Sequence, residues 1–193
     1  SHVTHSERLY VAIEAHLAKP GWQTSQLEGI IAALGPGSFT GLRIGLACAK
    51  AFAYSLDIPI VGVSSLAVLA ENGKNATGIV VPMIDARRGE IYAEIKNQCE
   101  EQAKTPEQWC EYLATFKETL HLYGDGALQY AEIFKTSLGK QVCIAPASEH
   151  CPRSAAMLNL GLAKLKEGGT EISQIVPNYI RQSDAEIGFR GNA

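Results

Sequence analysis

The sequence predicts an α/β protein whose sheets are covered by helices, and two features of the chain predict it. Short apolar runs of strand length alternate with segments whose apolar side chains recur at helical spacing. Glycine or proline interrupts the chain between most of these segments, which is typical of turns between regular elements. With 193 residues, 46% of them hydrophobic, the chain is long enough for one or two domains with a buried core.

The first part of the chain is expected to alternate helices with buried strands. Thr4 and Glu7 form a capping-box pattern, and Leu9, Ile13 and Leu17 give the helix that follows an apolar face. The two strand candidates are short, apolar and bounded by turn residues, as buried strands are. The expected elements are helices at residues 4–17, 38–56 and 65–72 and strands at residues 29–34 and 58–63.

After a linker at residues 74–77, the pattern changes to a hairpin whose second strand alternates apolar and polar side chains. Thr105, Pro106 and Gln108 then open a helix, with a capping box and with proline at the first helical position. Further strand and helix patterns follow in turn. The expected elements are strands at residues 79–84, 90–96, 120–123 and 141–144 and helices from Thr105, at residues 127–138 and at residues 153–166.

A glycine-dense run from Gly35 to Gly45 joins the first strand to the longest expected helix. A Walker loop requires lysine and a hydroxyl residue after its last glycine, where this chain has Leu42 and Arg43. A Rossmann turn requires a third glycine where Thr40 stands. The run therefore matches neither phosphate-binding motif. Two interpretations stay open: a tight turn that binds no ligand, and a contact for an anion or a partner at the first backbone amides of the helix. Ser38 or Thr40 is expected to cap the helix.

Small side chains form a stripe along this same helix. Gly41, Gly45, Ala49 and Ala53 recur every four residues and therefore share one face. Such a face lets another element approach closely. Because apolar side chains also occupy the neighbouring faces, the patterning favours a helix buried in the core over a partner interface.

Charge and hydropathy argue against several classes of protein. The net charge of −3 and the lack of a basic stripe disfavour a self-sufficient nucleic-acid binder, and Arg87 and Arg88 are the only adjacent arginines. The sequence shows neither an uncharged apolar stretch of membrane-spanning length nor a signal peptide. We therefore expect a soluble, cytoplasmic protein without membrane contact.

The cysteines and histidines do not form a recognisable metal site. The 5 cysteines lack a Cys-x-x-Cys pair, and the 5 histidines lack His-x-x-x-His spacing. Disulfides and a zinc site are therefore not expected. Cys48 and Cys143 lie in apolar segments, where we interpret them as small buried hydrophobic side chains.

Several ordered motifs together resemble the TsaB (YeaZ) family, whose members act in bacterial tRNA threonylcarbamoyladenosine synthesis. The resemblance runs along most of the chain, and ordered motifs at family-like spacing are more specific than a single loop. The motifs are Gly35 to Gly45, Gly62-Val63-Ser64-Ser65-Leu66, the segment from Pro82 to Tyr92, Gly124-Asp125-Gly126 and Pro177-Asn178-Tyr179-Ile180-Arg181.

The resemblance implies an actin-like (ASKHA, ribonuclease H-like) α/β fold with two lobes. The first lobe would span residues 1–76, with residues 180–193 as a candidate addition, and the second would span residues 77–179. Family members carry a strand hairpin before the helix that begins here near His5, so the first lobe is expected to lack this hairpin.

The resemblance also implies a subunit without catalytic residues of its own. The catalytic relative TsaD carries a His-x-x-x-His metal site after a strand like residues 58–63, and the corresponding positions here are Ser65 and Leu69. Neither side chain can replace imidazole as a metal ligand. The expected function is to scaffold TsaD, with the ATPase TsaE, during threonylcarbamoyl transfer to an adenosine of ANN-decoding tRNAs. In the absence of TsaD, the chain would form a homodimer. We expect tRNA to bind only through the complex. ATP or ADP would bind to the complex, and the chain would have no cofactor site of its own.

Three groups of residues are candidate sites, and a second function stays open. In that alternative the chain is a nucleotide-binding ATPase or a glycoprotease-like peptidase with Ser38 as nucleophile, although no histidine has a recognisable pairing with it. The first group, a partner interface, comprises Leu9, Ile13, Leu42, Leu46 and Lys50. The second group, the motif loop, comprises Gly35, Pro36, Gly37, Ser38, Phe39, Thr40, Gly41 and Arg43. The third group, a nucleotide or partner contact, comprises Asp85, Arg87 and Arg88.

Overall fold

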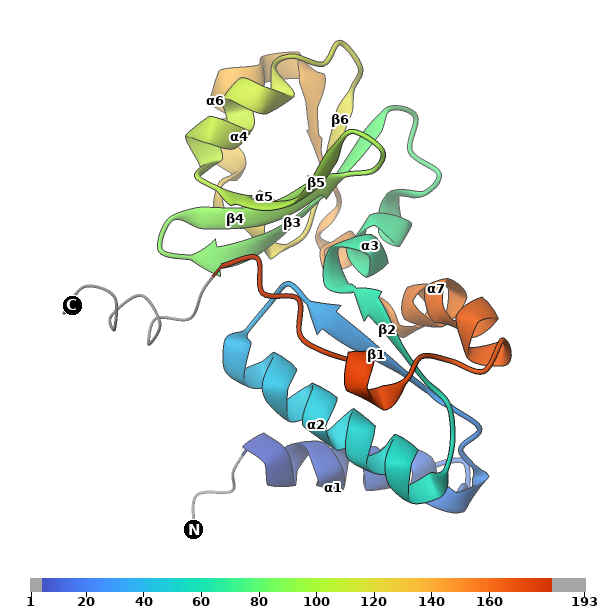
Figure 1. Ribbon diagram of the computed structural model, residues 1–193. Helices are drawn as coiled ribbons and strands as arrows, with labels where there is room; N and C mark the ends of the chain where they lie inside the picture. The colour runs from blue at the N-terminus through green and yellow to red at the C-terminus, as the bar shows by residue number, and fades with distance from the viewer. Residues whose placement is uncertain (1–4, 182–193) are drawn as a thin grey trace, which may run out of the picture. The chain divides into compact units, whose positions relative to one another are not determined.

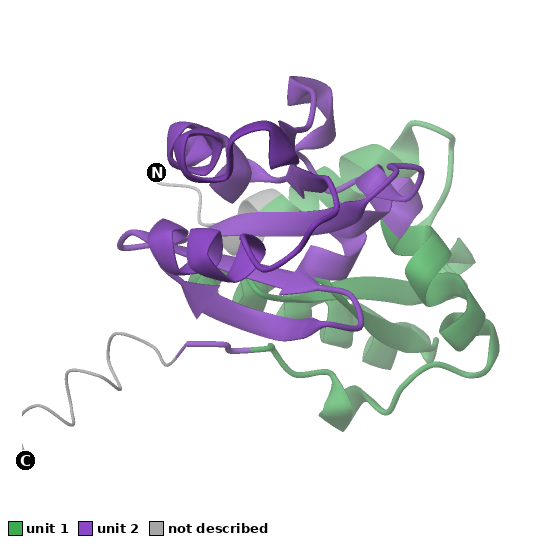
Figure 2. Ribbon diagram, turned by 90° about the horizontal axis from the view of Figure 1, so that it is seen from above, with its two compact units in different colours: residues 1–64, 157–178 green, residues 65–156, 179–193 purple. Residues whose placement is uncertain are grey.

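The computed structural model describes residues 5–181, which form two compact α/β units. Unit 1 contains residues 5–64 and 157–178 of the described chain, and unit 2 contains residues 65–156 and 179–181 (Figure 2). Unit 1 is therefore built from two separate stretches of sequence.

Unit 1 is built on a two-stranded parallel sheet. Strand β1 pairs with β2 in a register that runs from Ile30 opposite Ile60 to Ala33 opposite Val63. Helix α2 packs on β1, and α1 packs along α2 (Figure 1). The elements are α1 (His5–Ala18), β1 (Ile30–Gly35), α2 (Phe39–Leu56), β2 (Ile60–Ser64) and most of α7 (Ser154–Lys166), with short 3-10 turns at Thr24–Gln26 and Ile172–Gln174.

Helix α7 lies against the sheet through a glycine. A Cβ atom on Gly161 would come within 2.7 Å of the Ile31 side chain, so only the bare backbone permits this approach. On the α2 side, Leu46 and Ala53 form a buried cluster with Ala32 and Ile60. The two faces of this narrow sheet are therefore covered by different helices.

Unit 2 is built on a five-stranded mixed sheet with strand order β5-β4-β3-β6-β7. Strand β4 runs antiparallel to its neighbours β3 and β5, whereas β6 runs parallel to β3 and β7. The elements are α3 (Ser65–Ala70), β3 (Ile79–Arg87), β4 (Glu90–Ile95), β5 (Cys99–Lys104), α4 (Pro106–Leu113), β6 (Leu120–Tyr123), α5 (Asp125–Gln129), α6 (Ala131–Leu138) and β7 (Val142–Ile144), with 3-10 turns at Glu71–Gly73, Gly139–Gln141 and Ala147–Glu149.

The core of unit 2 is closed around aromatic side chains. Trp109 and Phe134 are fully buried with Leu113, Leu120 and Leu122. The indole N–H of Trp109 donates to the Ile91 carbonyl at 3.0 Å, so its one polar group is satisfied inside the core. This unit therefore has the interior expected of a stable domain.

The division into units differs from the lobes expected from the sequence. The change of unit comes after Ser64, and residues 157–178 return to unit 1. Packing explains both differences: Leu66 of α3 clusters with Ala86 and Tyr92 of unit 2, whereas α7 lies against β1. The candidate addition at residues 180–193 falls largely outside the described residues, and Ile180 and Arg181 belong to unit 2.

Most of the expected elements are present, with two differences. Strand β5 was not expected, because Cys99–Lys104 is polar and lacks alternation. The single helix expected at residues 127–138 is two helices, α5 and α6, which meet at Tyr130. The capping box expected at Thr4 lies partly outside the described residues. Within residues 5–181, helices are too short or too polar to cross a bilayer.

Candidate functional site

The glycine-dense run makes the turn from β1 into α2. Ser38 caps α2, because its Oγ accepts the backbone N–H of Gly41 at 3.3 Å. Gly35 has a φ of +111°, and a Cβ there would lie 2.9 Å from Leu42 Cδ1, so the turn requires glycine. Arg43 lies with its guanidinium 4.0 Å from the centre of the Phe39 ring. These contacts of the motif loop lie within unit 1.

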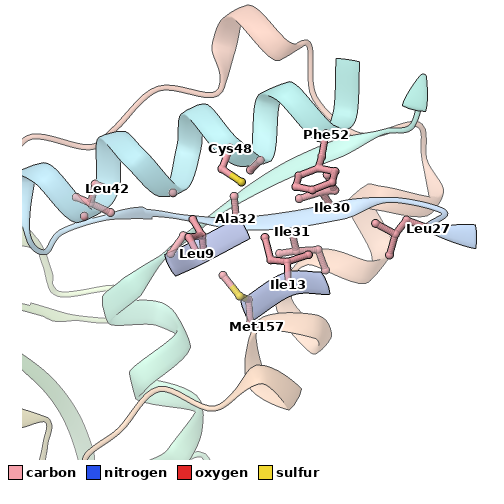
Figure 3. A pocket seen from close by; sticks show the side chains of 14 residues that line it. Leu9, Ile13, Leu27, Ile30, Ile31, Ala32, Leu42, Cys48, Phe52 and Met157 are labelled. Atoms are coloured by element: carbon pink, nitrogen blue, oxygen red, sulfur yellow. The ribbon is translucent and has the colours of Figure 1, made fainter. Parts of the chain in front are cut away.

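An apolar cavity of about 390 Å³ lies between α1, α2 and β1. Figure 3 shows side chains from both helices, from β1 and from α7 converging on it, Leu9, Cys48, Ile31 and Met157 among them. Gly41, Gly45 and Ala49 line the same space. The small-residue stripe of α2 therefore faces inward, as its patterning indicated, but it borders a cavity rather than a closely packed neighbour.

The cavity holds one nucleophilic side chain. Burial raises the pKa of the Cys48 thiol, which keeps this sulfur in its neutral form. A neutral thiol in an apolar wall behaves as a small hydrophobic group. A smaller cavity of about 260 Å³ adjoins Leu9, Ser38, Thr40, Gly41 and Ile44 at the start of α2.

Of the residues expected at a partner interface, Leu46 is buried and the other four are partly buried. Leu9, Ile13 and Leu42 line the apolar cavity. Leu46 is only 3% exposed and belongs to the core. Lys50 donates from Nζ to the Ile175 carbonyl at 2.9 Å. Four-residue spacing identified the apolar faces of α1 and α2 correctly, but those faces cover the sheet and the cavity.

The outward faces of these two helices carry other large apolar side chains. Tyr10, Val11 and Tyr54 are 48%, 60% and 81% exposed. The Tyr10 ring stacks on Phe52 with 6.2 Å between centroids, and a hydrogen bond to Glu14 raises the pKa of the Tyr10 hydroxyl. The sequence analysis does not single these residues out; for Tyr10 and Tyr54 the signal is an aromatic side chain on the polar side of a helix.

The hairpin turn between β3 and β4 brings Asp85 and Arg87 together. The Arg87 backbone N–H donates to Asp85 Oδ1, and Arg87 Nη1 lies 3.0 Å from Asp85 Oδ2. Asp125 joins them from the start of α5, where its Oδ1 accepts the Asp85 N–H at 3.0 Å. The Gly124-Asp125-Gly126 motif and the hairpin motif, far apart in sequence, therefore form one local structure. Arg88 follows at the tip of the turn.

His150 fixes the other side of the Gly124 motif. Its ring is buried, its Nδ1 lies 2.9 Å from the Gly124 nitrogen, and its Nε2 lies 2.7 Å from the Ala145 oxygen. Nδ1 also lies 2.9 Å from the Gly124 oxygen, so both ring nitrogens contact backbone groups of unit 2. Sequence reasoning treated this histidine as one of a dispersed set, and only the tertiary fold reveals its partners.

Ser65 and Leu69, which the resemblance matched to the TsaD histidines, both belong to α3 of unit 2. Ser65 begins α3, and Leu69 is buried against Tyr123 and Ala145. In the described part of the chain, His, Cys, Asp and Glu side chains form no group of three that could hold a metal ion. Ser38 is engaged as a helix cap, and the rings of His121 and His150 contact backbone groups of unit 2.

Comparison with known proteins places this chain among tRNA-modification proteins and their relatives. The family model for TsaD, described as tRNA N6-adenosine threonylcarbamoyltransferase, matches residues 1–189. The tRNA threonylcarbamoyladenosine biosynthesis protein TsaB of Bacillus subtilis is 37% identical over 191 residues, covering 94% of this chain and 82% of the relative. TsaB of Escherichia coli is 36% identical over 90 residues, which cover 46% of this chain and 39% of that protein.

Two solved structures from Pseudomonas aeruginosa share the fold. A protein with similarity to peptidase YeaZ superposes with a TM-score of 0.74 at 27% identity, covering 92% of this chain and 85% of that one. YeaZ superposes with a TM-score of 0.68 at 25% identity, covering 91% and 85% of the two chains. The mixed α/β fold is therefore a YeaZ-like fold.

Proposed function

The chain belongs to the TsaB (YeaZ) family, and from this premise we propose that it acts in tRNA threonylcarbamoyladenosine biosynthesis as a scaffold for the catalytic subunit TsaD. The observation that carries the proposal is the similarity to B. subtilis TsaB along 94% of the chain. The actin-like two-lobe architecture is part of the same proposal, and the two units are its candidate lobes.

A role without catalysis by this chain is supported by the residues at two positions. Where TsaD would carry metal-binding histidines, this chain has Ser65 and Leu69, and Leu69 is committed to the core of unit 2. Neither residue supplies a nitrogen ligand. The threonylcarbamoyl transfer would then occur on TsaD, with ATP or ADP and the ATPase TsaE entering through the complex and tRNA binding to the assembly.

The proposed TsaD contact lies on the outward faces of α1 and α2. Tyr10, Val11 and Tyr54 join the partly buried Leu9, Ile13 and Leu42 as its candidates, since they are the large apolar side chains that these helices expose. Tyrosine is enriched at protein interfaces, where its ring buries a large area and its hydroxyl keeps a polar contact. In the absence of TsaD, the same faces would serve a homodimer.

Co-purification tests this surface. Val11→Glu places a charge on the exposed face of α1 without removing any core contact, and we expect it to abolish co-purification with TsaD from the same cell. We also expect the cellular level of the modified nucleoside, measured by mass spectrometry, to fall in a strain that depends on this variant. Leu128→Glu is the matched control, because Leu128 is similarly exposed but lies on α5 of unit 2. Unchanged TsaD binding by Val11→Glu would contradict the proposed surface.

The peptidase or ATPase alternative has one observation in its favour, namely that a solved relative is described as similar to peptidase YeaZ. Ser38 is its candidate nucleophile, but its Oγ accepts the Gly41 N–H as a cap. Calorimetry of the chain alone with ATP and ADP, and turnover assays with peptide and ATP, separate the functions. Turnover by this chain alone, lost on Ser38→Ala, would overturn the scaffold proposal.

A further inference from the structure

The 3-10 turn that precedes β3 contains the only Asn-Gly pair of the sequence, Asn72 and Gly73. Asparagine is a chemically labile residue, and its side-chain amide is lost most readily when glycine follows. Glycine has no side chain to hinder attack by its own backbone nitrogen on the neighbouring amide. The packing of unit 2 shows why the chain keeps both residues at this turn.

Gly73 is required by its neighbours in the core. It is buried, and a Cβ on it would lie 2.5 Å from Tyr123 Cε2 and 2.9 Å from Val80 Cγ1. Both neighbours belong to a cluster with Leu69, which is 1% exposed. A larger residue would have to displace this cluster, so the position accepts only glycine without rearrangement.

Asn72 is required by two carbonyl groups. Its Nδ2 donates to the Glu149 oxygen and to the Cys151 oxygen, both at 2.9 Å. Because both acceptors are carbonyls, only the nitrogen end of the amide can face them. Asn72 Oδ1 is buried, and no residue that the structure describes donates a hydrogen bond to it. We call the two hydrogen bonds from Nδ2 the Asn72 clamp.

The Asn72 clamp holds the residues on both sides of His150. The buried His150 ring contacts Gly124 through Nδ1, which lies 2.9 Å from the backbone nitrogen and from the backbone oxygen. Its Nε2 lies 2.7 Å from the Ala145 oxygen. Asn72 therefore positions the histidine that holds the start of the Gly124-Asp125-Gly126 motif.

We propose that Asn72-Gly73 is a deamidation site that the native fold restrains, and that deamidation permanently releases the Asn72 clamp. The Gly73 nitrogen attacks Asn72 Cγ, and the new N–Cγ bond closes a succinimide ring. The Cγ–Nδ2 bond breaks, and the Gly73 amide proton leaves with Nδ2 as ammonia. Water then opens the ring at either carbonyl and gives aspartate or isoaspartate.

The native turn opposes ring closure in two ways. The residues that flank it, Ala70 and Lys74, have right-handed helical backbone angles, and the turn must leave this conformation before the Gly73 nitrogen can reach Cγ. The Asn72 clamp also fixes the side chain that has to rotate. The reaction therefore proceeds from a locally opened state.

The product cannot restore the clamp. An aspartate carboxylate has acceptors only, so it has no proton to donate to the Glu149 and Cys151 carbonyls. One of its oxygens would also occupy the buried place of Oδ1, where the described residues supply no donor. Residues 149–151 are therefore released from Asn72 once the amide is lost.

Peptide mass spectrometry of the full chain, aged in mildly alkaline buffer, tests the restraint. We expect Asn72 to deamidate at least about tenfold more slowly in the folded chain than in urea. His150→Leu removes the ring contacts that hold residues 149–151 and should speed the reaction in the folded chain. His121→Leu is the matched control, because this ring contacts the Thr77 oxygen of the same unit. Equal rates in buffer and urea, or no difference between the two variants, would overturn the restraint.

Asn72→Asp produces the deamidated side chain directly and tests the release. We expect the Gly124 amide to exchange with deuterium at least about tenfold faster in this variant than in the wild type, because His150 is no longer held from both sides. Asn97→Asp makes the same change at an exposed turn of unit 2 whose φ of 64° suits aspartate, and it should leave Gly124 unchanged. Unchanged exchange in Asn72→Asp, or equal acceleration in Asn97→Asp, would contradict the release.

Discussion

Units 1 and 2 fill their interiors to different extents. In unit 2, five strands and their helices enclose fully buried side chains such as Trp109 and Phe134. In unit 1, only two strands are present among the described residues, and an apolar cavity of about 390 Å³ remains beside β1. Both units draw on similarly apolar sequence, so the difference lies in how many elements surround the apolar side chains. A narrow sheet needs helices to supply the stability that neighbouring strands supply elsewhere.

Matched leucine truncations should give the largest contrast between the units. Leu122→Ala removes a fully buried side chain from unit 2 and should cost about 4 kcal/mol of unfolding free energy. Leu9→Ala enlarges a space that is already empty and should cost about 1 kcal/mol. Urea denaturation monitored by circular dichroism gives both values. Equal losses would mean that the cavity is filled in solution.

Added methyl groups probe whether each interior can adjust. A Cβ on Gly124 would overlap the Met83 carbonyl oxygen at a positive φ of 107°, so Gly124→Ala should cost about 3 kcal/mol. The three atoms nearest to a Cβ on Gly62 of unit 1 all belong to the Leu34 side chain, the first at 2.5 Å. Because Leu34 can rotate, Gly62→Ala should cost less than half as much. Thermal unfolding of the two variants measures both losses of stability. A larger loss for Gly62→Ala than for Gly124→Ala would show that unit 1 is the more rigid unit.

A third variant should stabilise the protein. Gly45 lies inside α2, lines the cavity and has open space at its Cβ position. Gly45→Ala should therefore raise the unfolding free energy by about 0.5–1 kcal/mol, mainly by restricting the unfolded chain. Gly161→Ala is the control, since its Cβ would press on Ile31 and should destabilise the same unit. Destabilisation by Gly45→Ala would show that another group occupies the cavity.

The smallest expected effect is a pH dependence in unit 2. Burial, reinforced by Glu101 and opposed by Lys96, raises the pKa of Glu94. A raised folded-state pKa means that stability from the protonated carboxyl is present at low pH and is lost as pH rises through that pKa. Glu94→Gln should therefore unfold at a higher temperature than the wild type near neutral pH and match it in acid. Melting curves from pH 3 to pH 8 test this, and a constant difference across that range would exclude Glu94 as the cause.

Local signals predicted the elements well, whereas contacts distant in sequence decided the sites. The Ser38 cap and the reciprocal capping box of Thr105 and Gln108 are present as predicted, since each depends on residues within one turn of helix. Strand β5 escaped prediction because it takes its place from pairing with β4, and its own residues are polar.

The site residues show the same limit. Helical spacing places Leu42 and Leu46 on apolar faces, but it cannot tell a face that meets the sheet from one that meets a partner. The hairpin arginines were identified in the sequence as a pair. Their orientation depends on Asp125, far along the chain, and no local pattern links that residue to Asp85.

The broken sequence of unit 1 sets an order of events during synthesis. Residues 65–156 of unit 2 leave the ribosome before α7, whose Gly161 packs on Ile31, and before Ile175, which accepts the hydrogen bond from Lys50. Unit 2 can therefore complete most of its fold while one face of β1 is still uncovered. A nascent chain halted before α7 would expose that face, which makes unit 1 the part of the molecule most in need of a chaperone.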